Sequence, residues 1–252
     1  MPGISEPHIK VSGVAVGFGD RVLLQNLDFE VLRGEVFAIL GGSGCGKSTV
    51  LRHLIGFEKP MRGSILVDGK PPGLSGGAPG FGVLFQSGAL FGSMTLAQNV
   101  ALPLSTWTDL SRADLDEVVR SKLRLVGLGG FENHLPAELS GGMKKRAGIA
   151  RALALDPPLV FLDEPSAGLD PITSAELDEL ILTLSRSLGM TLVIVTHELP
   201  SIFAIASRCV MLDREAKGMI ALGEPRELRD HGTDPTVAAF FNRRAREGGA
   251  RA

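Results

Sequence analysis

The alternation of apolar and polar residues predicts two kinds of strand. The segments KVSGVAVGFG and LDFEVLRGE, both within residues 10–35, alternate in the way of short antiparallel strands with one solvated face. Later apolar runs lack this alternation, which is typical of strands buried on both faces. We expect such strands at residues 35–40, 81–86, 158–164, 191–197 and 209–213, with a closing strand pair through residues 218–225.

Helical patterns lie between these apolar runs. One helix is expected to begin near Lys47, and another at Ser111, where Asp114 takes the place of a capping-box acid, ending near Val126. Further helices are expected from Ser140, over residues 174–188 and over 199–207, with a loop at 127–138. Buried strands that alternate with helices predict an α/β fold with a parallel, helix-covered sheet.

Composition narrows the class of protein. The chain has 252 residues and a formal net charge of −2, so nothing indicates electrostatic binding to nucleic acid. Its two cysteines, Cys45 and Cys209, argue against a disulfide framework and fit a reducing compartment. The first residues lack a secretory pattern, and no apolar run of about 18 residues predicts a membrane span.

Residues Pro71 to Thr108 include no charged side chain. One interpretation is a buried strand with its flanking loops. The other is a surface that meets an apolar partner, because water-facing segments of this length normally carry charge. The sequence alone leaves both open.

The segment GGSGCGKS matches the phosphate-loop pattern G-x-x-x-x-G-K-[ST] between an expected strand and an expected helix. Glycines let backbone N–H groups surround phosphates, the helix start adds partial positive charge, and Lys47 adds a full charge. The Ser48 hydroxyl is placed to bind Mg²⁺. Cys45 occupies a variable position and is interpreted as a small filler. The predicted nucleotide-binding residues here are Gly41, Gly42, Ser43, Gly44, Cys45, Gly46, Lys47, Ser48 and Thr49.

Two acids follow the apolar run LVFL, where ligands bind in open α/β sheets. Asp163 is the candidate for the Mg²⁺ shell, and Glu164 the candidate to polarise the attacking water. A second glycine-containing helix start, LSGG, provides Ser140 as N-cap and leaves the first N–H groups at Gly141 and Gly142 open. The cations Lys144, Lys145 and Arg146 that follow are interpreted as a helix face rather than phosphate ligands.

These segments, in this order, resemble the ATP-binding cassette ATPases over nearly the whole chain. Residues 41–48 match the Walker A loop, Gln86 the Q-loop, LSGGM the signature motif and LVFLDE Walker B; SAGLD (166–170) matches the D-loop and His197 the switch histidine. The resemblance implies a P-loop NTPase core with an N-terminal antiparallel β subdomain and an inserted helical signature subdomain. We expect the nucleotide-binding domain at residues 8–245, its helical subdomain at about 88–155, and a flexible basic tail at 246–252.

The resemblance also implies roles for single residues. Phe18 would stack on adenine, although tyrosine is commoner there; an ordinary core position is the alternative. Gln86 would sense Mg²⁺ and water, and His197 would hold the γ-phosphate and orient Glu164. Asp170 would contact the phosphate loop of the opposite subunit, because ATP would lie between the Walker A loop of one subunit and the signature motif of the other.

Partners follow from a narrower resemblance. The segments LFQSGALF, LSGGMKKRAGIARAL, DEPSAGLDPITS and FFNRR are similar to phospholipid-transport ATPases of the Mla type. This implies a homodimer at the cytoplasmic face of the inner membrane, docked on a permease through the uncharged residues 87–104. It further implies an MCE-type lipid-binding protein and a small regulatory subunit. Phe240 and Phe241 are interpreted as core of a short final helix, or as part of a docking site.

Two other functions were weighed. A soluble cassette ATPase that acts on DNA or the ribosome usually has two cassettes or a long coiled coil, and the sequence has neither. A regulatory module without turnover would be expected to lack Glu164 or His197, and both are present.

Overall fold

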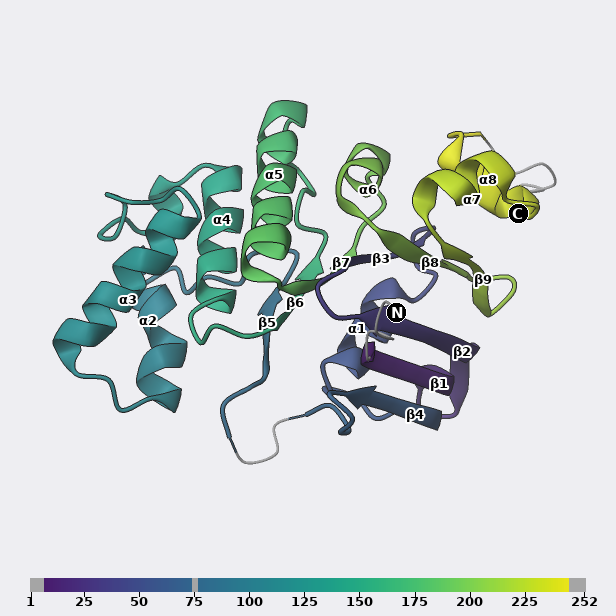
Figure 1. Ribbon diagram of the computed structural model, residues 1–252, viewed down its shortest axis with the longest axis horizontal. Coiled ribbons are helices and arrows are strands. Elements are labelled where there is room, and N and C mark those ends of the chain that lie inside the picture. Colours follow the sequence, from purple (N-terminus) through teal and green to yellow (C-terminus); the bar gives the residue numbers. More distant parts are fainter. Residues whose placement is uncertain (1–6, 74–76, 245–252) are drawn as a thin grey trace, which may run out of the picture. The chain divides into compact units, whose positions relative to one another are not determined.

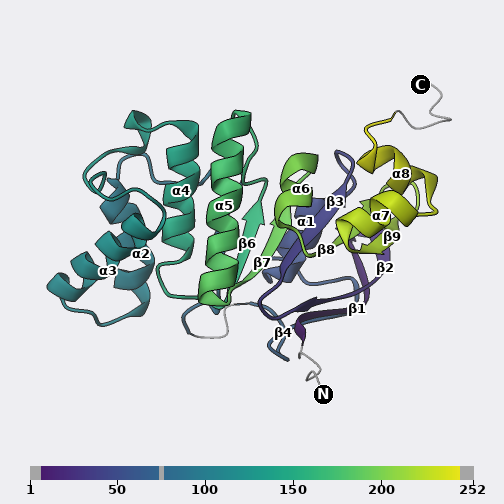
Figure 2. The same ribbon diagram turned by 45° about the horizontal axis from the view of Figure 1, so that its top comes forward.

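A computed structural model describes residues 7–73 and 77–244. It divides the chain into two compact parts, which we describe separately (Figures 1 and 2). The terminal part comprises Met1–Pro72 and Val195–Ala252, and the middle part comprises Gly73–Ile194. The predicted tail at 246–252 lies outside the described residues.

An antiparallel sheet opens the terminal part. Strands β1 (Pro7–Phe18), β2 (Arg21–Leu32) and β4 (Arg62–Val67) pair in the order β2-β1-β4. Alternating side chains of β1 and β2 are buried, because one face of the sheet is covered. The predicted antiparallel pairing is therefore confirmed, although β1 and β2 are long strands of a single hairpin rather than several short ones.

The second sheet of the terminal part is mixed. Strand β3 (Val36–Gly41) pairs in parallel with β8 (Arg208–Asp213), which pairs antiparallel with β9 (Gly218–Gly223). All six residues of β3 are buried, as its unbroken apolar run predicts. Helix α1 (Lys47–Leu54) follows β3, so the predicted succession of strand, glycine loop and helix is confirmed.

Three short helices complete the terminal part: α6 (Leu199–Ile205), α7 (Pro225–His231) and α8 (Pro235–Phe241). Val237 and Phe241 of α8 are buried in one cluster with Leu40 and Met211, and Phe240 packs against it. This confirms the interpretation of the two phenylalanines as core of a final helix. Helix α7 was not predicted.

The middle part contains three strands in the order β5-β6-β7, namely β5 (Phe81–Leu84), β6 (Leu159–Asp163) and β7 (Thr191–Val195). Strands β5 and β6 are parallel, and Leu84 is paired with Leu162. Gln86 and Glu164 therefore each lie two residues beyond a paired position, at the same edge of the sheet.

Helices make up most of the middle part: α2 (Leu96–Trp107), α3 (Arg112–Leu125), the 3₁₀ turn η1 (Pro136–Glu138), α4 (Gly141–Ala152) and α5 (Pro171–Leu188). Helix α4 contacts α2, α3, α5 and β5, and Figures 1 and 2 show it between the α2–α3 pair and α5. The predicted N-caps Ser111 and Ser140 are confirmed, since each hydroxyl accepts a backbone N–H from three residues further on.

Three expectations about elements were wrong. Helix α2 lies in the uncharged stretch, where a Thr95–Gln98 capping box starts it despite Pro103 in its interior. Helix α5 begins at Pro171 rather than at residue 174, because Asp170 caps it. The expected loop at 127–138 includes η1.

The fold is the expected P-loop α/β fold, with an antiparallel β subdomain and signature helices inserted within the middle part. The exact domain boundaries stay a prediction. Within residues 7–73 and 77–244, no helix has both the length and the apolar character that a bilayer crossing requires.

Candidate nucleotide site

The loop between β3 and α1 has the backbone of an anion cradle. Gly41, Gly44 and Gly46 have φ angles of 142°, 72° and 108°, a region that favours glycine. A Cβ atom at Gly41 would lie 2.4 Å from the Leu212 carbonyl oxygen. The glycines therefore serve a backbone path that few other residues would allow.

The first turn of α1 is open to an anion. No side chain caps its N-terminus, so the partial positive charge of the helix start is not neutralised locally. The Lys47 ammonium donates to the carbonyl oxygens of Gly41 and Gly42 over 2.9 and 3.2 Å, which holds it across the loop. Ser48 is exposed on the same turn. A full charge, a helix dipole and a hydroxyl thus converge, as phosphate binding requires.

A pocket of about 430 Å³ adjoins the loop. Its lining includes Phe18 at one side and Lys47, Ser48 and Thr49 at the other, with Arg21 and Arg214 between the strands. Phe18 is 58% exposed, so the alternative that it is an ordinary core residue is wrong. An exposed ring beside an anion cradle suits a ligand with an aromatic base and phosphates. The two arginines were not found from the sequence, because nothing local marks them.

Cys45 lies beneath the loop and is buried. Its Sγ atom would be 2.6 Å from a Cβ atom at Gly41, so the thiol fills the space under the loop. Burial raises the pKa of the Cys45 thiol, and the nearby Lys47 charge opposes this shift. The interpretation of Cys45 as a small filler agrees with this packing.

In the middle part, Asp163 ends β6 and Glu164 follows it. Glu164 is 8% exposed and has a φ of 47°, which is unusual for a residue with a side chain. Its carbonyl oxygen accepts hydrogen bonds from the Lys145 ammonium at 2.9 Å and from the Ala167 N–H at 3.2 Å. Strained backbone of this kind is often found at functional sites.

Gln86 is exposed beyond the end of β5. Its carbonyl oxygen accepts a hydrogen bond of 2.5 Å from the same Lys145 ammonium. The structure thus brings the backbones of Gln86 and Glu164 to one buried lysine. Lys145, interpreted from the sequence as part of a helix face, in fact points inward.

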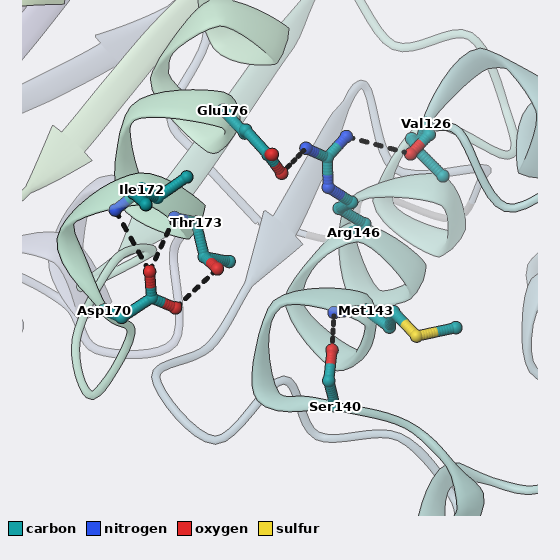
Figure 3. A network of polar contacts seen from close by, with 8 residues as sticks. All are labelled: Val126, Ser140, Met143, Arg146, Asp170, Ile172, Thr173 and Glu176. Atoms are coloured by element: carbon teal, nitrogen blue, oxygen red, sulfur yellow. Dashed lines mark hydrogen bonds and ion pairs between the residues drawn. The ribbon is translucent and has the colours of Figure 1, made fainter.

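The second glycine-containing helix start has a different design from the first. Ser140 caps α4 by accepting the Met143 N–H at 3.3 Å, while Ser140 and Gly141 stay exposed (Figure 3). Gly142 is buried, and a Cβ atom there would lie 2.4 Å from the Thr173 Cγ2 atom. Gly142 therefore also serves the close packing of α4 against α5.

Arg146 holds this start of α4 in place, because its guanidinium reaches Glu176 and the Val126 carbonyl, each at 3.3 Å (Figure 3). Asp170 caps α5: one carboxylate oxygen accepts the N–H groups of Ile172 and Thr173, and the other accepts the Thr173 hydroxyl (Figure 3). Those hydrogen bonds, the Thr173 hydroxyl first, lower the pKa of Asp170. Its role toward an opposite subunit stays a prediction.

His197 follows β7 in the terminal part, and 57% of its side chain is exposed, 3.7 Å from the Glu198 carboxylate. The terminal part thus contains Phe18, the phosphate loop and His197. The middle part contains Gln86, the signature residues, Asp163, Glu164 and Asp170.

The donor set is suited to magnesium. Ser48, Gln86 and Asp163 offer hydroxyl, amide and carboxylate oxygens, the hard ligands that Mg²⁺ prefers. Over the described ranges, no group of three or more His, Cys, Asp or Glu side chains could hold a metal by itself. A cation that shares its shell with phosphates and water needs no such group.

A phosphate loop at the end of a buried strand, an aromatic-walled pocket beside it and paired acids after a second strand define a P-loop nucleotide-binding ATPase. The family model described as "ABC transporter" matches residues 24–167. The chain belongs to this family, as an ATP-binding and ATP-hydrolysing subunit of a membrane transporter.

Two relatives illustrate the similarity. The chain is 43% identical over 242 residues to the "Probable ribonucleotide transport ATP-binding protein mkl" of Mycobacterium leprae, covering 94% of this chain and 69% of that protein. It is 41% identical over 230 residues to the "Intermembrane phospholipid transport system ATP-binding protein MlaF" of Escherichia coli K12, covering 89% of this chain and 84% of that protein.

Solved structures agree. CbiO1 of Clostridium perfringens, titled as part of the ABC transporter complex cbiONQ, matches with a TM-score of 0.80 at 31% identity, over 89% of this chain and 91% of that one. The cassette MJ0796, titled as a dimer in a post-hydrolysis state bound to ADP and Pi, matches with a TM-score of 0.75 at 29% identity, over 86% and 98%.

Proposed function

We propose that this chain powers the movement of phospholipids between membranes, as a homodimer docked on an integral-membrane permease. The observation that carries the substrate class is the similarity to MlaF, which spans 84% of that protein. The proposal includes an MCE-type lipid-binding protein and a small regulatory subunit as further partners. It places the chain peripherally at the cytoplasmic face of the inner membrane.

In the proposed mechanism, ATP binds with its base against Phe18 and its phosphates in the loop of residues 41–48. Lys47 and the α1 start offset the phosphate charge. Mg²⁺, held by Ser48, Asp163 and Gln86, would supply further charge neutralisation. Glu164 accepts a proton from the water that attacks the γ-phosphate, and His197 orients the reacting groups. The products are ADP and inorganic phosphate.

We propose that the second subunit completes the site. Ser140 and the N–H groups near Gly141 and Gly142 would contact the γ-phosphate of ATP bound to the partner, with Asp170 beside them. The exposure of Ser140 and Gly141 supports this role, because they remain accessible to another chain. Donors supplied in trans to a transferring phosphoryl group can be worth about 10³ to 10⁵ in rate. A lone subunit should therefore hydrolyse ATP slowly.

Ribonucleotide transport is the second candidate function, because the mycobacterial relative carries that name. The test purifies the full-length chain from membranes with its co-purifying membrane proteins. ATP hydrolysis is then measured with added phospholipid vesicles or with added ribonucleoside monophosphates. Stimulation by phospholipid and co-purified lipid support the proposal. Stimulation by ribonucleotides alone would favour the second candidate, and recovery of the chain with nucleic acid or ribosomes would contradict both.

A further inference from the structure

Lys145 is a buried cation on the signature helix α4. It is 6% exposed, and its ammonium donates to the carbonyl oxygens of Gln86 at 2.5 Å and of Glu164 at 2.9 Å. Burying an ammonium group is costly unless it is well paired. Desolvation lowers the pKa of Lys145, while the Asp163 and Glu164 carboxylates oppose this shift. An apolar residue could fill this space, so the position of a cation here needs a reason.

The two accepting carbonyls occupy matching places in the sheet. Leu84 of β5 is paired with Leu162 of β6, and Gln86 and Glu164 each follow two residues later. Beyond the ends of the strands the regular ladder no longer joins the two segments. Lys145 takes over this connection, because one ammonium group has three donors and can bind both carbonyls at once.

Helix α4 grips the segment after Gln86 at further points. The Arg151 guanidinium donates to the carbonyl oxygens of Ala89 at 2.7 Å and of Gly88 at 3.1 Å. A Cβ atom at Gly148 would lie 2.5 Å from the Leu84 Cδ1 atom and 3.3 Å from the Gly88 carbonyl oxygen. Two cations and one close backbone approach thus fasten the loop to the helix. A displacement of α4 must carry this loop with it.

We propose that Lys145 is a positioning residue that ties the backbone of Gln86 to the backbone of Glu164, so that the signature helix moves the nucleotide sensor and the general base together. The proposal rests on the roles assigned to Gln86 and Glu164 under the proposed function. Lys145 itself touches neither nucleotide nor water in this scheme.

The backbone of Glu164 explains why positioning is needed. Its φ of 47° is sparsely populated for residues with a side chain, so contacts must hold it there. The Lys145 bond fixes the carbonyl of that strained residue and thereby the direction in which its side chain leaves the chain. A misplacement of about 1 Å at a reacting group can cost about 10²-fold in rate.

The test compares four variants of the full-length chain by phosphate release over a range of ATP concentrations. Lys145→Met keeps the length and removes the donors, Lys145→Gln keeps donors with less reach, and Lys145→Arg keeps the charge and the reach. Lys144→Met is the matched control, since Lys144 is the neighbouring, half-buried lysine of the same helix. Binding of a fluorescent ATP analogue is measured in parallel.

We expect Lys145→Met to lower kcat about 10- to 100-fold while KM and analogue binding change less than about twofold. Lys145→Arg should recover most of the rate, and Lys144→Met should match the wild type. Amide hydrogens near residues 86–89 and 164–167 should exchange faster in Lys145→Met. A wild-type kcat in Lys145→Met would overturn the proposal, as would a loss that changes KM equally and is not rescued by arginine.

Two provisions keep the result decisive. If Lys145→Met does not fold, the arginine and glutamine variants decide: a kcat at least tenfold higher for arginine supports the proposal, and equal values overturn it. Glu164→Gln is measured beside them. If it keeps near wild-type turnover, the assignment of the general base is wrong; if it is inactive while Lys145→Met is normal, only the positioning role fails.

Discussion

At the residue scale, the paired acids of the middle part differ in their surroundings. Asp163 still belongs to β6, whereas Glu164 is buried in a left-handed backbone conformation directly after it. A carboxylate fixed in this way can accept a proton from a positioned water only if its own geometry is maintained. Chemical role and backbone strain therefore meet in one residue.

Replacing Glu164 by glutamine should separate binding from hydrolysis. The amide has nearly the same shape, so ATP should still bind, but it cannot act as a base. We expect the rate of phosphate release to fall about 10²- to 10⁴-fold, the usual contribution of a general base. Single-turnover phosphate release and ATP-dependent dimerisation measure the two effects. Glu179→Gln, at an exposed position of α5, is the control, and near wild-type turnover in Glu164→Gln would refute the assignment.

Sequence and structure agree best where the signal is local. The glycines of the phosphate loop and the cap residues Ser111 and Ser140 act on backbone within a few positions, so spacing alone predicts them. The role of Lys145 could not be predicted in this way. Its partners lie 59 and 19 positions away, and a run of three cations does not reveal which one turns inward.

At the element scale, the uncharged stretch combines a rigid loop with α2. The buried Asn99 side chain accepts the Phe91 N–H and donates to the carbonyl oxygens of Phe91, Met94 and Thr95. This network fixes the loop while the Phe91 ring remains 50% exposed. Both interpretations of the stretch thus apply to different residues. Helix α2 escaped prediction because its capping box uses Thr95 and Gln98, without any charge to mark it.

Phe91→Glu should uncouple the chain from its permease without unfolding it. Substitutions at exposed positions usually change the free energy of unfolding by less than about 0.5 kcal/mol, so Tm should hardly move. A carboxylate on an apolar docking face would have to be desolvated, so membrane co-fractionation should be lost. Leu188→Glu, at a site of 53% exposure on α5, should keep it. Aggregation of the Phe91 variant would instead indicate that the ring supports the core.

At the scale of the whole molecule, the two glycine-containing helix starts have different partners. The α1 start lies beside Lys47 and a pocket of its own part, whereas the α4 start shows Ser140 and Gly141 exposed. A site that uses both starts at once, one from each of two chains, agrees with the dimeric title of the MJ0796 structure. Twofold symmetry would then produce two such sites in each dimer.

Ser140→Arg tests this arrangement. The bulky cation should block the approach of a partner's ATP, so turnover should fall at least about 10³-fold, while nucleotide binding by the isolated subunit stays intact. Gly142 is less suitable, because any side chain there meets Thr173 within its own chain. Loss of the Ser140 cap alone should cost about 1 kcal/mol of stability.

Ser111→Arg provides the matched control, since it removes an equivalent 3.3 Å cap from the exposed start of α3. It should lose a similar amount of stability and keep its turnover. Equal loss of turnover in both variants would assign the effect to the cap, and loss of binding by the Ser140→Arg monomer would refute a contribution in trans. Retained binding with lost turnover in Ser140→Arg alone means that the second helix start serves the nucleotide of another chain.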